Sequence, residues 1–192
     1  MTTVAFIGLG NMGSGMADNL VKNDYNVLAF DLSEAALAKA KEAGCTIAQS
    51  TEQAAAEADI VITMLPAGKH VKDIYSNQIL ASVREGTLLI DCSTIDVETA
   101  KSVSELAEKK GLKMLDAPVS GGVAAAAGGT LTFMVGGDAD AFDKAHGVLS
   151  AMGKKIVHAG GHGAGQAAKI CNNMLLGATM IATCESFQLA QK

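Results

Sequence analysis

The chain has 192 residues, of which 49% are apolar and 4% aromatic, and its formal net charge at pH 7 is −5. This length and apolar content can bury one large core, and 21 glycines suit close packing of helices on a sheet. A negative chain without a basic cluster argues against a nucleic-acid partner. No uncharged apolar stretch is long enough to span a bilayer, and a strand is expected from Val4 on, so we expect no leader peptide and a soluble protein.

The four cysteines, Cys45, Cys92, Cys171 and Cys184, lack the spacing of metal ligands or of a disulfide framework. Histidines and carboxylates do not cluster at ligand spacing either, so we expect no metal site. Scattered cysteines of this kind are typical of a reducing compartment, which predicts core thiols in a cytoplasmic protein.

The N-terminal segment has the pattern of a dinucleotide-binding site. An apolar run at residues 4–7 leads into Gly8, Gly10 and Gly13 and then into a helical pattern. In such a site the first glycine permits a tight turn, the second lets the backbone approach a pyrophosphate, and the third lets the helix pack closely on the strand. The pyrophosphate then lies on the free N–H groups at the helix N-terminus. Glycine-rich loops also form plain turns, but here strand, glycines, helix, strand and acid occur in the required order.

The acidic residue is Asp31, which ends the next apolar run at close to the usual spacing of about 20 residues after the glycines. A carboxylate there accepts hydrogen bonds from the ribose hydroxyls of NAD and repels the 2′-phosphate of NADP. Leu32 and Ser33 supply no arginine for that phosphate. Asp31 could also cap the following helix, although Ser33 is better placed to do so, and both roles can coexist. The sequence therefore predicts NAD as the cofactor.

Strand-like and helix-like segments alternate along the chain. The expected strands cover residues 4–7, 26–30, 46–48, 60–64, 87–90, 113–115, 131–135 and 155–158. Such alternation predicts an α/β fold with a doubly wound, mostly parallel sheet covered on both faces. Ligands bind such sheets at the carboxyl ends of the strands.

Three further signals follow expected strands. Leu65-Pro66 and Thr94 fall on the cofactor side of such a sheet, although ordinary turn chemistry explains them equally well. Ser120 is followed by Gly121 and Gly122, and a hydroxyl before two glycines can present backbone N–H groups to one carboxylate. These glycines could also form only a turn.

Residues 166–191 read as one long helix whose only charged residues are Lys169 and Glu185. A helix that is apolar on every face is normally buried, and the sequence supplies nothing to bury it, so we expect self-association through it. Lys169 and Asn173 share a face, with Asn172 beside them. Burial lowers the pKa of a lysine and suits it to proton transfer. We expect a domain at residues 1–162 and the start of an interdomain helix at residues 163–192.

Five motifs resemble those of the β-hydroxyacid dehydrogenases, and in chain order they occupy residues 8–13, 64–66, 91–96, 116–122 and 163–173. Residues 131–137 and 169–173 are most similar to the 3-hydroxyisobutyrate dehydrogenase branch of that family. The resemblance implies a Rossmann-type domain and hydride transfer between NAD and a small 3-hydroxy acid. Tartronate semialdehyde reductases share these motifs, and a non-catalytic NAD-binding fragment is a further alternative.

The resemblance also implies residue roles. Lys169 would be the catalytic acid/base, and the substrate-binding residues would be Ser120, Gly121, Gly122, Asn172 and Asn173. The implied cofactor-binding residues are Gly8, Leu9, Gly10, Asn11, Met12, Gly13, Asp31, Leu65, Pro66, His70 and Thr94. Family members continue from this helix into a second, all-helical domain that commonly mediates dimerisation. The sequence ends inside the helix, so we expect that domain to be absent, which leaves full activity of this chain alone an open question.

Overall fold

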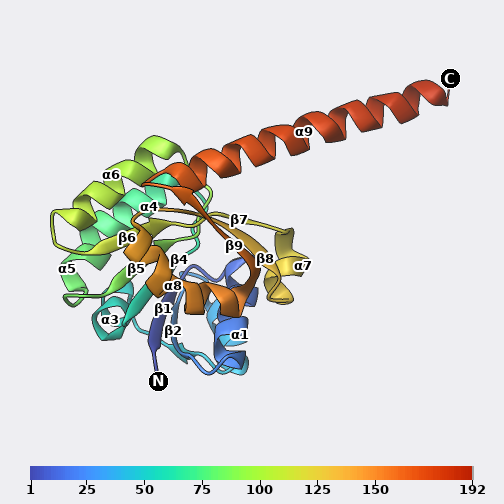
Figure 1. The fold of residues 1–192 in the computed structure, drawn as a ribbon. Coiled ribbons are helices and arrows are strands. Elements are labelled where there is room, and N and C mark those ends of the chain that lie inside the picture. Colours follow the sequence, from blue (N-terminus) through green and yellow to red (C-terminus); the bar gives the residue numbers. More distant parts are fainter. Residues whose placement is uncertain (192) are drawn as a thin grey trace.

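The computed structural model describes residues 1–191 and confirms the α/β fold (Figure 1). The strands are β1 (Thr3–Ile7), β2 (Asn26–Phe30), β3 (Thr46–Ile47), β4 (Ile60–Thr63), β5 (Leu88–Asp91), β6 (Lys113–Asp116), β7 (Val119–Ser120), β8 (Leu131–Gly136) and β9 (Gly153–Gly160). The helices are α1 (Gly13–Lys22), α2 (Glu34–Glu42), α3 (Thr51–Glu57), α4 (Gly68–Ile74), the π-helical turn η1 (Tyr75–Ile79), α5 (Leu80–Ser82), α6 (Val97–Glu108), α7 (Gly122–Ala127), α8 (Ala139–Met152) and α9 (Ala164–Ala190).

All strands belong to one sheet in the order β3-β2-β1-β4-β5-β6-β8-β7, with β9 beside β8. The pairs from β3 through β6 are parallel, as is β8 with β9. β8 runs antiparallel to β6 and β7. The predicted mostly parallel sheet is therefore confirmed. The strand β7 was not predicted, because its two residues lie between a proline and two glycines, a pattern that is typical of a turn.

Helices cover both faces of the sheet. Val4 and Phe6 of β1 pack into a core with α1, α2 and α8, whereas Ala5 and Ile7 pack into a second core with α3 to α6. Successive side chains of a strand point to opposite faces, so a continuous apolar run is what a strand buried on both faces requires.

α9 leaves the domain after its first turns (Figure 1). Gly165 and Gln166 are buried and Lys169 is partly buried, but every residue from Ile170 to Gln191 is exposed. The expectation that all four cysteines lie in the core is therefore wrong for the two on α9, which are exposed, although the other two are buried. Within residues 1–191, no helix has the length and apolar character needed to cross a membrane.

α1 and α7 meet backbone to backbone at Gly15. A Cβ atom at Gly15 would lie 2.8 Å from the nitrogen of Ala127 and 2.9 Å from the carbonyl carbon of Ala126. One turn later, the side-chain amide of Asn19 donates a 2.8 Å hydrogen bond to the carbonyl of Ala126. These contacts hold α7, and with it the glycines at its start, against α1.

Gly15→Ala should therefore destabilise the fold by about 1–3 kcal/mol, because α7 must move to admit the methyl group. Urea unfolding measures this change in the free energy of unfolding. Gly177→Ala is the matched control, since a Cβ atom at Gly177 of α9 would meet nothing within 4 Å. An unchanged stability of the Gly15 variant would contradict this account of the contact.

Candidate cofactor and substrate site

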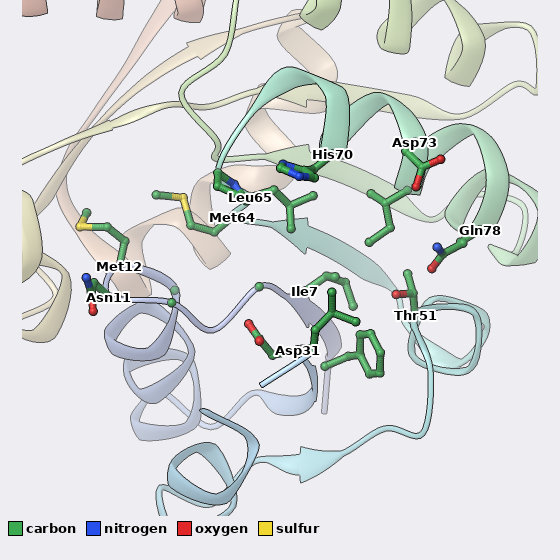
Figure 2. A pocket seen from close by; sticks show the side chains of 17 residues that line it. Ile7, Asn11, Met12, Asp31, Thr51, Met64, Leu65, His70, Asp73 and Gln78 are labelled. Atoms are coloured by element: carbon green, nitrogen blue, oxygen red, sulfur yellow. The ribbon is translucent and has the colours of Figure 1, made fainter. Parts of the chain in front are cut away.

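A cavity of about 580 Å³ lies at the carboxyl ends of β1, β2 and β4 (Figure 2). The predicted cofactor residues that line it are Gly8, Gly10, Asn11, Met12, Gly13, Asp31, Leu65, Pro66 and His70. Figure 2 shows His70 and Leu65 across the cavity from Asp31. The structure thus brings together residues from four separate segments of the chain.

Other lining residues escaped the sequence analysis, namely Ile7, Phe30, Leu32, Thr51, Met64, Asp73, Ile74 and Gln78. Thr51 begins α3 and Gln78 lies in η1, and neither stands in a recognisable ligand motif. The apolar residues before the glycines and before Asp31 could have been found, because they end the two strands that supply those groups.

The three glycines differ in what surrounds them. Gly8 has φ +97°, and a Cβ atom there would collide with the carbonyl oxygen of Met64. A Cβ atom at Gly13 would collide with the carbonyl oxygen of Gly8, so Gly13 permits the close packing of α1 on β1. Gly10 has nothing within 4 Å of its Cβ position. This open space at the N-terminus of α1 fits a pyrophosphate.

Asp31 is held in place by backbone N–H groups. Its carboxylate accepts hydrogen bonds from the amide of Leu9 at 2.6 Å and from the amide of Ser33 at 2.8 Å. Ser33 caps α2 by accepting from the amide of Ala36, so Asp31 does not serve as that cap. The side chain of Leu9 is buried, and Leu9 acts here through its backbone. The remaining lone pairs of Asp31 suit ribose hydroxyls.

A buried hydrogen-bond network lies behind the Leu65 wall of the cavity. The hydroxyls of Thr63 and Ser93 donate to the same oxygen of Asp91, at 2.7 Å and 2.6 Å. The Tyr75 hydroxyl lies 3.1 Å from that of Thr63, and the Leu65 amide donates to the Ser93 hydroxyl at 2.8 Å. Burial raises the pKa of Asp91 to about 6, and the hydrogen bonds from Ser93 and Thr63 oppose that shift.

The start of α9 is tied to the ends of β5 and β6. Asp116 accepts from the amides of Gly163 at 2.7 Å and Gln166 at 2.9 Å. The Gln166 side chain donates to the carbonyl of Ser93 at 2.7 Å and accepts from the amide of Ile95 at 3.1 Å. Sequence reasoning missed these anchors, because an aspartate or glutamine gives no sign of a partner so distant along the chain.

Lys169 follows one turn after Gln166, at the point where α9 leaves the domain. Partial burial lowers the pKa of its amine, in the predicted direction. Along residues 1–191, no hydrogen bond or ion pair engages this amine. Asn172 donates to the side-chain oxygen of Asn173 at 3.3 Å, and both are exposed.

The other predicted substrate residues lie on β7 and at the start of α7. Ser120 pairs with Thr132 of β8, and Gly121 and Gly122 have φ values of +131° and +70°, which favour glycine. The predicted residues outside the lining of the 580 Å³ cavity are Leu9, Thr94, Ser120, Gly121, Gly122, Lys169, Asn172 and Asn173. Their assigned roles remain predictions. The part of the chain described here contains no group of three His, Cys, Asp or Glu residues arranged to hold a metal.

The raised pKa of Asp91 makes the stability of the fold depend on pH. The pKa of Asp91 is about 6 in the native state, whereas the ordinary pKa of an aspartate, which applies to the unfolded chain, is 3.8. The native state therefore binds one more proton between these values, and stability falls as pH rises through this window. Asp91→Asn should make the pH-dependent decrease in the free energy of unfolding smaller by up to about 3 kcal/mol, at 1.36 kcal/mol per pKa unit. Urea unfolding of both proteins at pH 4 and pH 7 measures the difference, and parallel pH dependence would contradict it.

Residues 3–161 match the family described as the NAD binding domain of 6-phosphogluconate dehydrogenase. The chain is 52% identical to a probable mitochondrial 3-hydroxyisobutyrate dehydrogenase of Dictyostelium discoideum, covering 99% of this chain and 60% of the relative. It is 51% identical to an NAD-dependent L-serine dehydrogenase of Pseudomonas aeruginosa, covering 98% of this chain and 64% of the relative.

The structure is similar to that of Mycobacterium tuberculosis 3-hydroxyisobutyrate dehydrogenase with L-serine, with a TM-score of 0.97 and 52% identity, covering all of this chain and 66% of that one. The chain therefore spans less than two thirds of the length of these relatives. The resemblance to hydroxyacid dehydrogenases expected from the motifs is confirmed. The glycine loop after β1, the aspartate after β2 and the sheet order agree with this match. The chain therefore belongs to the family of the NAD-binding domain of 6-phosphogluconate dehydrogenase.

Proposed function

We propose that this chain supplies the cofactor-binding and proton-transferring parts of an NAD-dependent oxidoreductase for a small 3-hydroxy acid. The favoured reaction converts 3-hydroxyisobutyrate to methylmalonate semialdehyde. The cavity carries the proposal, because it combines an open glycine position beside the N-terminus of α1 with an oriented Asp31. In this proposal residues 1–162 form the cofactor domain, and residues 163–192 begin a helix that leads away from it.

NAD, when bound, supplies the acceptor for the hydride. Lys169 in its neutral form takes the proton from the substrate hydroxyl, and its lowered pKa increases the neutral fraction. Ser120, Gly121 and Gly122 hold the carboxylate, so that the hydroxyl-bearing carbon faces the cofactor. Asn173, with Asn172 beside it, orients the substrate and the lysine.

L-Serine is a second candidate substrate. The Pseudomonas aeruginosa relative is named an L-serine dehydrogenase, and the Mycobacterium tuberculosis structure contains L-serine. L-Serine and 3-hydroxyisobutyrate share a carboxylate and a 3-hydroxyl group. Tartronate semialdehyde reduction is a third candidate, since its enzymes share the motifs. A non-catalytic NAD-binding role would show binding without turnover.

NAD(H) should bind this chain more tightly than NADP(H), because a 2′-phosphate would meet the carboxylate of Asp31. Asp31→Ala should narrow the preference by about tenfold, equivalent to about 1.4 kcal/mol. Isothermal titration calorimetry with both cofactors measures it. Equal or tighter binding of NADP(H) by the unmodified chain would overturn the assignment of Asp31.

Lys169→Ala should lower turnover by at least about 100-fold and change NAD affinity little, since general acid–base catalysis contributes about 10²–10⁴-fold. NADH formation is followed with 3-hydroxyisobutyrate and L-serine, and NADH consumption with tartronate semialdehyde. The assays use this chain and a fusion with the segment of the Mycobacterium tuberculosis relative that it does not match. A melting curve controls for folding, and near-normal turnover of a folded variant would exclude Lys169 as the acid/base.

The exposed part of α9 should make the chain self-associate, most simply as a two-fold dimer. Its exposed side chains include Met174, Leu175, Ile181 and Phe187, each more than 60% accessible. Contiguous apolar surface of this kind normally marks an interface, and apolar association survives high salt. Light scattering over a dilution series in low and high salt tests this, with Phe187→Glu as a weakened variant. A monomer at micromolar concentration with α9 folded would refute it.

A further inference from the structure

We propose that Ser93 is a positioning residue that fixes the Leu65-Pro66 wall of the cofactor cavity and the start of α9 to one buried point. Ser93 lies two residues after β5, between the end of β4 and the first turn of α9. This inference rests on the proposed function, because it concerns how the cofactor and Lys169 are held relative to each other. It assigns a role to a residue outside the cavity.

Ser93 connects Leu65 of the cavity wall to Gln166 of α9, and we call the Leu65 half of this link its cofactor side and the Gln166 half its helix side. The cofactor side depends on the Ser93 hydroxyl, which is fully buried. Its single proton goes to Asp91 at 2.6 Å, so a lone pair is left to accept from the Leu65 amide at 2.8 Å. Asp91 thereby sets the direction of the bond that holds Leu65. Leu65 and the next residue, Pro66, both line the cavity.

The same oxygen of Asp91 also connects, through Thr63, to another part of the cavity wall. Thr63 gives its proton to Asp91, so the hydroxyl of Tyr75 must donate to Thr63. Tyr75 is fully buried and begins η1, directly after Ile74 and before Gln78, which both line the cavity. One carboxylate therefore orders the hydroxyl groups behind two segments of the cavity wall.

The helix side of the link depends on the backbone of Ser93. Its carbonyl accepts from the side chain of Gln166 at 2.7 Å, and that side chain also accepts from Ile95. Gln166 is fully buried in the first turn of α9, and residues three apart on a helix are neighbours on its surface. The position of Gln166 therefore sets where Lys169 emerges. Two hydrogen bonds through Ser93 join Leu65 to Gln166.

Ser93→Ala tests the cofactor side. The substitution leaves the buried amide of Leu65 without its acceptor, and NAD affinity should fall about tenfold by calorimetry. Ser104→Ala is the matched control, because Ser104 is equally buried in α6 but its hydroxyl makes no hydrogen bond within the described chain. The control should bind NAD within twofold of the unmodified chain. Unchanged affinity in a folded Ser93 variant would overturn the proposal.

Gln166→Met tests the helix side with a side chain of similar length and no hydrogen bonds to Ser93 or Ile95. NAD affinity should stay within twofold, while the pKa of the Lys169 amine, measured by carbon-13 NMR of its ε-carbon, should rise toward the usual lysine value. The rise follows because a displaced α9 exposes the amine. Gln188→Met, on the exposed part of α9, should leave that pKa unchanged. An unaltered Lys169 pKa in the Gln166 variant would overturn the helix side.

Ser93→Cys keeps a weaker donor and acceptor at the same position, and it should lower NAD affinity less than Ser93→Ala does. This variant and Gln166→Met carry the test if Ser93→Ala does not fold. NAD binding by the unmodified chain separates the two levels of the proposal. Absence of binding there defeats the proposed function, whereas binding that is equal in the unmodified chain and both Ser93 variants defeats only the role of Ser93.

Discussion

Two buried carboxylates at the ends of adjacent strands constrain the site. Asp91 ends β5 and Asp116 ends β6, where the two residues are register partners. A buried carboxylate is costly unless hydrogen bonds replace its water shell. One oxygen of Asp91 obtains them from Thr63 and Ser93, while its other oxygen has no hydrogen-bond partner within the described residues. Asp116 obtains them from the amides of Gly163 and Gln166 at the start of α9. Loss of these donors would leave buried carboxylates without hydrogen bonds, which is unfavourable. The loop after β5 and the start of α9 are therefore fixed to the sheet.

What the sequence reveals depends on how local each constraint is. The requirement for Gly8 and Gly13 arises from strand, turn and helix in immediate succession, so spacing alone predicts it. The strands of the parallel sheet can also be predicted from local sequence, because burial on both faces requires continuous apolar runs. The link between Ser93 and Gln166 joins residues 73 apart in sequence. Its two ends look like ordinary loop and helix residues until the fold brings them together.

The long helix shows the limit of periodicity in another way. Apolar residues on every face of α9 indicate that it needs partners, but they do not say where the helix stops contacting its own domain. That point falls between Gln166, which is fully buried, and Ile170, which is 46% exposed. Lys169 lies within this short interval. Three turns further on, the same side chain would be fully solvated, and burial would no longer lower its pKa.

The proposed roles of the site residues bear on which substrate is preferred. In the proposed function, the residues assigned to the substrate would act on its carboxylate and its 3-hydroxyl, which 3-hydroxyisobutyrate and L-serine have in common. Those two molecules differ at the second carbon, where one carries a methyl group and the other an ammonium group. A hydrogen-bonding site rejects a substrate that leaves its polar groups unpaired far more strongly than an apolar pocket rejects one by size. In the proposed function, the groups facing the second carbon would therefore decide between the two substrates. Two relatives of nearly equal identity to this chain carry different substrate names.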